Sequence, residues 1–429
     1  MNTVTTSFRN FARSNVLPGL YLSQSLIMTA GNFVMTPLII SRLGNSTYIF
    51  WITANAYTSL LLLADWGFIN HFRVLLTNMY TRTRLFHFGI WKKAVIYMNC
   101  FGLILAIILV LMLSLVPIRN DNSGNQFLIL LLLGLLTSFL VLLEHLFIMK
   151  FQVFNLEARS TSITLIYRIC EVFVQILLLI IYPSIYLIFT ISLMGRTGSL
   201  LTLAIRAPTI EKKFDSQEKD DTSIVRTFQK SIGSLSFVLS NVLYANILTL
   251  ILSMILSTST FTIFQISKMI VSPILMVGSA LTIGTTQGLL IKGVSNFSLF
   301  DKLRLKELIL PLFFLFSTAS FLLLITPVVW LHLYATSHDL NRKLICLIAL
   351  QYIFDSLVWL MSRDFYNLNR VFRIGLLNFT FSIFAIICVP TAEHQFGIQS
   401  VPLVLVFFDI MLLFLAIQPR GRKWLLQSV

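Results

Sequence analysis

The sequence predicts an all-α polytopic membrane protein with twelve transmembrane helices in two lobes of six. Long apolar runs such as Phe127–Leu143 and Leu308–Trp330 alternate with short loops. The composition is 57% hydrophobic and only 11% charged, whereas soluble domains carry about 25% charged residues. The Lys and Arg residues also fall mostly on alternate loops, as expected of a chain that crosses a membrane repeatedly.

The apolar runs predict helices, because barrel strands would show alternating segments of about ten residues. A helix needs roughly 20 mostly apolar residues to cross the hydrocarbon core. A polar N-terminal stretch without a cleavage site suggests that the first helix is its own insertion signal. The predicted helices span residues 16–40, 48–71, 94–117, 126–149, 163–182, 184–206, 231–256, 260–290, 308–333, 343–362, 374–391 and 399–417.

One segment has two interpretations. Leu85–Ala94 mixes aromatic residues with Lys92 and Lys93. It is either an interfacial helix on the inner surface or an extension of the third membrane helix.

The basic residues predict the orientation. With these spans, 26 of the 32 Lys and Arg residues lie on one side, four on the other and two inside helices. This count assigns Arg168, near the start of the fifth helix, to the same side as the loop before that helix. The bias predicts that both termini are cytoplasmic. The net charge of +15 is therefore attributed to topology and anionic membrane lipids, and no nucleic-acid partner is expected.

The charged segment Arg206–Lys230 divides the helices into six and six. We expect an N-terminal lobe (1–206), a cytoplasmic connector (207–230), a C-terminal lobe (231–417) and a basic cytoplasmic tail (418–429). Thr47–Trp51 and Thr260–Phe264 open the second helix of each half with similar residues. Two halves in the same orientation predict a parallel repeat about an axis along the membrane normal.

No enzyme motif is present: the sequence has no P-loop, GxSxG, HExxH or GxGxxG pattern. We expect no catalytic residue, no cofactor and no metal site. The four cysteines lie in or beside apolar runs and indicate packing residues. No predicted external loop exceeds about a dozen residues, which disfavours an external active site.

Charges inside membrane helices are candidates for function, because burying them in hydrocarbon is costly. Arg196 lies in the middle of the sixth helix, where it is either a substrate contact or part of a structural salt bridge. Lys268 lies in the eighth helix, from which its long side chain could also reach outward.

The acidic residues well inside the predicted spans are Asp65, Asp355 and Asp409. They are candidates for ion coupling, or for pairing with Arg196 and Lys268, and Asp65 is also placed to cap a bend. Glu144 and Glu171 are expected near the inner ends, in contact with headgroups or loop cations. Glu171 follows Arg168 by three residues, which favours a local helix pair.

Polar residues share one face in the first helix of each half. The first helix has Ser25, Thr29, Asn32 and Thr36 at helical spacing, and the seventh has Gly233, Ser236, Ser240, Asn241 and Tyr244. These faces either pack against other helices or line a hydrated path.

The stretch from Pro37 to Phe68 resembles polysaccharide flippases of the Wzx type, in the multidrug/oligosaccharidyl-lipid/polysaccharide (MOP) exporter superfamily. Ile49 departs from the glycine that usually follows the tyrosine. The matching residues are Pro37, Arg42, Leu43, Gly44, Tyr48, Asp65, Gly67 and Phe68.

The resemblance implies a V-shaped central cavity between the lobes that opens alternately to each side of the bacterial inner membrane. It implies an undecaprenyl-diphosphate-linked glycan as substrate, for O-antigen or lipopolysaccharide biosynthesis, with a polysaccharide polymerase and a chain-length regulator as further partners. The expected substrate-binding residues are Arg196, Lys268, Arg42, Asn32, Asn241 and Tyr244. A cation-coupled multidrug antiporter and a membrane-embedded glycan polymerase are the alternatives.

Overall fold

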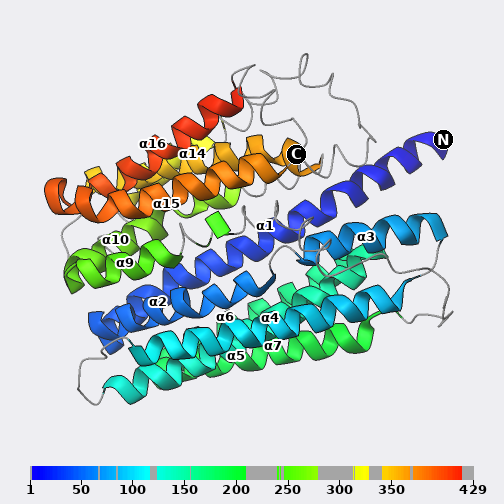
Figure 1. Cartoon of the computed structure of the whole chain (residues 1–429), viewed down its shortest axis with the longest axis horizontal. Coiled ribbons are helices and arrows are strands. Elements are labelled where there is room, and N and C mark those ends of the chain that lie inside the picture. The colour runs from blue at the N-terminus through cyan, green and yellow to red at the C-terminus, as the bar shows by residue number, and fades with distance from the viewer. Residues whose placement is uncertain are drawn as a thin grey trace. The chain divides into compact units, whose positions relative to one another are not determined.

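The computed structural model describes residues 2–65, 68–83, 86–115, 123–154, 156–208, 239–240, 242, 246–278, 313, 315–327, 341–367 and 371–417. Regular structure in these residues is entirely helical (Figure 1). Eight helices there are long and apolar enough to cross a membrane, and Leu315–Pro327 and Ser400–Leu415 are shorter apolar helices. The predicted all-α polytopic membrane fold is confirmed.

The contacts divide the chain into two units. Unit 1 is Met1–Asn45 with Leu252–Val429, and unit 2 is Ser46–Ile251. The predicted connector lies almost wholly outside the described residues, so the predicted domain boundaries stay a prediction.

The labelled elements are α1 (Asn2–Leu43), α2 (Asn45–Ser59), η1 (Leu60–Asp65), α3 (Phe68–Thr83), α4 (Phe88–Leu115), α5 (Ser123–Val153), α6 (Glu157–Ile181), α7 (Ile185–Arg206), α9 (Leu248–Ile255), α10 (Thr258–Val271), α14 (Arg342–Asn367), α15 (Val371–Phe396) and α16 (Ser400–Ile417).

The predicted second helix, 48–71, is not continuous. After α2 the chain tightens into the 3-10 turn η1, and α3 starts at Phe68. The carboxylate of Asp65 accepts a hydrogen bond from the backbone N–H of Ile69 at 2.9 Å. It satisfies a donor in the first turn of α3 that has no partner within the helix. The prediction that Asp65 caps a bend is confirmed.

Two further predictions are settled by helix boundaries. Phe88–Ala94 form the start of α4, so the segment extends the membrane helix and the separate interfacial helix is wrong. α6 begins at Glu157, and Arg168 therefore lies deep inside a helix. Counting it with the preceding loop was wrong, because the polar start of α6 concealed that the helix begins six residues before the predicted residue 163.

Glycines permit close helix packing in unit 2. A Cβ added to Gly134 of α5 would lie 2.6 Å from Cγ2 of Thr58 on α2, closer than carbon atoms can approach. Tyr57 of α2 also donates a hydrogen bond from its hydroxyl to the Leu109 carbonyl of α4 at 2.5 Å. The α2 helix is thus held against both α4 and α5.

Unit 1 packs α10, α14, α15 and α16 together, and α1 contacts α10. A Cβ on Gly278 would lie 2.3 Å from Oγ of Ser356 on α14. Gly397 has φ of +74° between α15 and α16, a left-handed conformation that glycine adopts at little cost. Gly278 thus allows a close approach to α14, and Gly397 forms the turn between α15 and α16.

Candidate functional site

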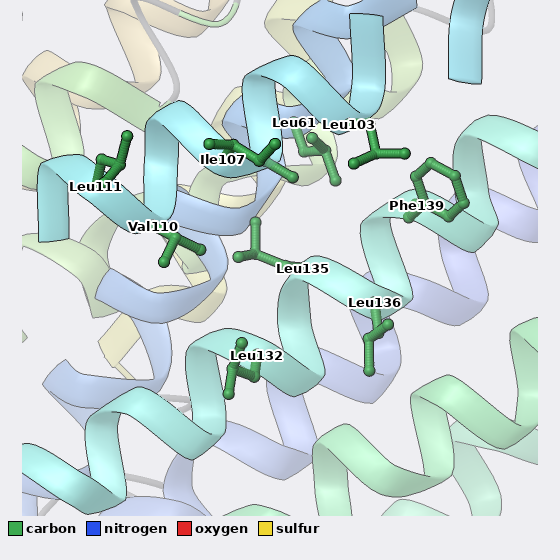
Figure 2. A pocket seen from close by; sticks show the side chains of 10 residues that line it. Leu61, Leu103, Ile107, Val110, Leu111, Leu132, Leu135, Leu136 and Phe139 are labelled. Atoms are coloured by element: carbon green, nitrogen blue, oxygen red, sulfur yellow. The ribbon is translucent and has the colours of Figure 1, made fainter. Parts of the chain in front are cut away.

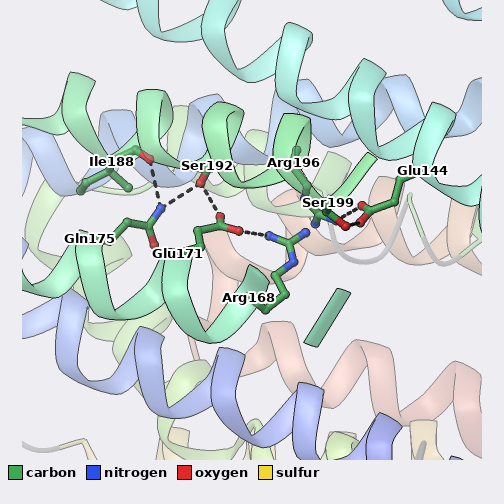
Figure 3. A network of polar contacts seen from close by, with 8 residues as sticks. All are labelled: Glu144, Arg168, Glu171, Gln175, Ile188, Ser192, Arg196 and Ser199. Carbon is green, nitrogen blue, oxygen red and sulfur yellow. Dashed lines mark hydrogen bonds and ion pairs between the residues drawn. The ribbon is translucent and has the colours of Figure 1, made fainter. Parts of the chain in front are cut away.

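Unit 2 contains a buried network of charged and polar side chains that joins α5, α6 and α7 (Figure 3). Glu144 belongs to α5, and its side chain is only 2% exposed. Its carboxylate accepts hydrogen bonds from Arg196 and Ser199, both on α7. Glu144 was expected to contact headgroups or loop cations, and that expectation is wrong because its side chain points between helices to Arg196 and Ser199, which lie within α7.

The second part of the network runs along α6 and α7. Nη1 of Arg168 lies 2.5 Å from Oε2 of Glu171, as the three-residue spacing predicted. Oε1 of Glu171 accepts from the Ser192 hydroxyl at 2.7 Å. The Gln175 amide donates to the Ser192 oxygen at 2.8 Å and to the Ile188 carbonyl at 3.0 Å. Glu171 is 6% exposed and does not reach the headgroups.

Glycines on α7 make room for this network. A Cβ on Gly195 would lie 3.3 Å from Oε2 of Glu171, and one on Gly198 would lie 2.6 Å from Cε1 of Tyr167. The Tyr167 hydroxyl is hydrogen-bonded to Thr202 at 2.7 Å. The small residues of α7, at spacings of three and four, were the sequence signal that could have predicted a buried polar interface.

The positive and negative charges within this network balance each other. Two glutamates face two arginines, and Figure 3 shows the Arg168 guanidinium between the two carboxylates. Within the described residues, Nη2 of Arg168 and Nε of Arg196 are buried without a hydrogen-bond partner. Arg196 thus forms the salt bridge that was one of its two predicted roles, with Glu144 as its partner. Its role as a substrate contact stays a prediction.

Unit 1 holds the remaining predicted acids. Asp355 lies on α14 and Asp409 on α16, two helices that pack against each other. Asp409 is 4% exposed, and its Oδ2 has no hydrogen-bond partner among the described residues. Two carboxylates without a described arginine or lysine partner form a site of excess negative charge, which a proton or a cation would relieve.

Unit 1 also holds Lys268, on α10. Its ammonium lies 5.7 Å from the ring centre of Phe264, one turn earlier on the same helix. Across the part of the chain that is described, Lys268 forms no salt bridge. It differs in this from Arg168 and Arg196.

The polar face of α1 has a mixed role. The Thr29 hydroxyl donates to the sulfur of Met276 at 2.7 Å, and Thr36 is 1% exposed, so part of the face packs within unit 1. Asn32 is half-buried and Arg42 is exposed at the last turn of α1. The predicted contacts Asn241 and Tyr244 lie outside the described residues.

The structure also contains an apolar groove of about 450 Å³ between α4, α5 and η1 (Figure 2). The groove has no polar group suited to a sugar or a phosphate, and it is not a glycan site. Its lining residues are Leu61, Leu103, Ala106, Ile107, Val110, Leu111, Leu132, Leu135, Leu136 and Phe139. No cluster of three metal-ligating side chains occurs in the described ranges.

The chain has the fold of MOP-superfamily transporters. The lipid II flippase MurJ in an inward closed conformation aligns with a TM-score of 0.63 at 13% identity, over 91% of this chain and 86% of that one. The MATE multidrug transporter DinF-BH aligns at 0.60 with 12% identity, over 96% of both chains. A MOP transporter from Pyrococcus furiosus aligns at 0.58 with 11% identity, over 96% and 95%. No protein-family model and no curated protein matches the sequence.

The network predicts strong coupling between Glu144 and Arg196. Removing either partner leaves an uncompensated buried charge, so Glu144→Ala and Arg196→Ala should each lower stability by about 3–5 kcal/mol. The double variant should cost clearly less than the sum. Thermal unfolding of purified protein in detergent measures this cycle, and Thr197→Ala, an exposed position on α7, is the control. Additive effects of the two changes would contradict the pairing.

Proposed function

We propose that this protein is a flippase that moves undecaprenyl-diphosphate-linked oligosaccharide repeat units across the bacterial inner membrane. The surface polysaccharide would be O-antigen or a similar glycan. Such a substrate cannot cross hydrocarbon unaided, because its phosphates and hydroxyl groups would lose their hydration. The proposal rests on the residues Pro37–Phe68, on the transporter fold and on the charges inside the membrane helices.

The observation that carries the proposal is the ammonium of Lys268. In the described part of the chain it lies inside a membrane helix without a carboxylate partner. A transporter for cationic drugs has no use for an uncompensated cation in its membrane region, whereas a diphosphate supplies the missing negative charge. MurJ, one of the structural neighbours, is a flippase of a lipid-linked substrate by its name.

Three acidic residues in the membrane region are compatible with an anionic substrate, because other groups of the protein pair with them. Glu144 and Glu171 are neutralised by arginines, and Asp65 caps α3. These groups do not oppose an anionic substrate. Asp355 and Asp409 remain, and we assign them to a coupling cation or proton whose binding and release would drive the conformational cycle. Arg42, Asn32, Asn241 and Tyr244 are proposed to contact the glycan or its phosphates.

The first prediction concerns the substrate class. Deleting the gene in a strain without a paralogue should abolish the surface glycan and make lipid-linked repeat units accumulate at the cytoplasmic face. Mass spectrometry of extracted lipids and electrophoresis of surface polysaccharide measure both. Unchanged surface glycan would refute the flippase, and increased drug sensitivity with normal glycan would instead establish the drug antiporter.

A second prediction concerns Lys268. Lys268→Gln should reduce surface glycan at least tenfold at normal protein level, because a neutral amide binds a diphosphate far less well than an ammonium does. Lys268→Arg keeps the charge and should restore much of the activity. Lys92→Gln, at an exposed position, is the control for charge loss. Wild-type glycan from Lys268→Gln would remove this residue from the substrate site.

The same assay separates the two roles of Arg196. If Arg196 only compensates Glu144, the Glu144→Ala, Arg196→Ala double variant should recover flipping together with stability. If Arg196 also contacts the phosphates, the double variant should be stable and inactive.

A third prediction concerns the carboxylate pair. Asp355→Asn and Asp409→Asn should each retain binding of the lipid-linked substrate but lose its net movement, since an amide cannot take up and release a proton or hold a cation as firmly. Substrate binding to purified protein and transport in proteoliposomes under pH and sodium gradients measure the two steps. Gradient-driven transport at wild-type rates in both variants would show that the pair has no coupling role.

A further inference from the structure

One lysine of unit 2 is surrounded by aromatic rings at the end where α4 begins and α5 ends. The ammonium of Lys150 lies 5.9 Å from the ring centre of Phe86 and 5.8 Å from that of Trp91. Both distances are within the range of cation–π attraction. Lys150 comes three residues before Val153, the last residue of α5, and so lies at the end of a candidate membrane-spanning helix.

The rings are held by other contacts. Phe86 is 7% exposed and stacks on Phe154, with centroids 5.4 Å apart and an interplanar angle of 16°. Tyr80 meets Phe154 edge-on at 5.0 Å. Trp91 packs edge-on against Phe147 at 5.9 Å, and its indole N–H points to the Leu146 carbonyl at 3.5 Å. The aromatic surroundings of Lys150 are therefore a built feature of α3, α4 and α5.

The charge of Lys150 has no partner of opposite sign in the described part of the chain. Arg168 and Arg196 each form a salt bridge with a glutamate. Glu157, at the start of α6, accepts a hydrogen bond from Gln152 at 2.7 Å. Aromatic faces attract a cation without neutralising it. The half-buried ammonium is therefore accessible to an anion from outside the described chain.

We propose that Lys150, with Phe86 and Trp91, binds the phosphate of an anionic phospholipid in the adjacent leaflet. Basic pockets between membrane helices take anionic headgroups, and aromatic residues favour this depth of the bilayer. The lipid phosphate supplies the charge that Lys150 lacks, while the acyl chains lie along the apolar faces of α4 and α5. This lipid site shares no residue with the proposed substrate contacts.

Native mass spectrometry of the full-length protein tests the proposal. Wild-type protein should retain phosphatidylglycerol in preference to phosphatidylcholine. Lys150→Gln should lower that preference about fivefold, as expected for one lysine at a charged lipid surface. Lys150→Arg should keep it. Lys92→Gln is the matched control, because Lys92 follows Trp91 in sequence but is exposed and touches no ring.

Three results would overturn the assignment. The first is an unchanged lipid preference in Lys150→Gln, and the second is an equal loss in Lys92→Gln. The third is displacement of phosphatidylglycerol from the wild type by equimolar polyprenyl diphosphate, dependent on Lys150, which would assign the site to the transported lipid. Thermal unfolding confirms folding of each variant, and Lys150→Met, which keeps the aliphatic stem, replaces Lys150→Gln if that variant does not fold.

Discussion

The electrostatic pairing of Glu144 with Arg196 is the interaction on which the organisation of unit 2 depends. A charged group in hydrocarbon is stable only where another charge or a polar group compensates it. Glu144 is supplied by α5 and Arg196 by α7, and the neighbouring Arg168 and Glu171 come from α6. Three helices must therefore pack in one register, and the glycines and serines of α7 are required because larger residues would separate these groups.

Unit 1 is organised differently, and the difference separates structural charges from candidate functional ones. Among the described residues, Asp355 and Asp409 have no basic partner, and Lys268 contacts only the ring of Phe264 on its own helix. Charges already compensated within the protein stabilise the packing. Charges without a described partner are the ones that we propose to bind a ligand or a proton during transport, and our proposal for Lys150 applies the same reasoning to a lipid phosphate.

Much of the fold followed from the sequence because hydrophobic length and charge bias act locally. The spans that became α5, α7 and α16 lie within a few residues of their predicted limits, since each is a continuous apolar run between polar ends. The predictions failed where the polarity of a segment did not match its structure. Because α6 starts with polar residues, Arg168 was counted with the preceding loop. An apolar run concealed the break at Asp65, whose side chain accepts a hydrogen bond from the first turn of α3.

The sequence by itself determined that the chain is a polytopic helical membrane protein and identified Arg196, Lys268 and the aspartates as unusual. Only the tertiary structure decided which of them are compensated. The physical reason is that pairing depends on distance between helices far apart in sequence. The spacing of Arg168 and Glu171 on one helix was readable in advance, but the contact of Glu144 with Arg196 exists only once α5 and α7 have packed.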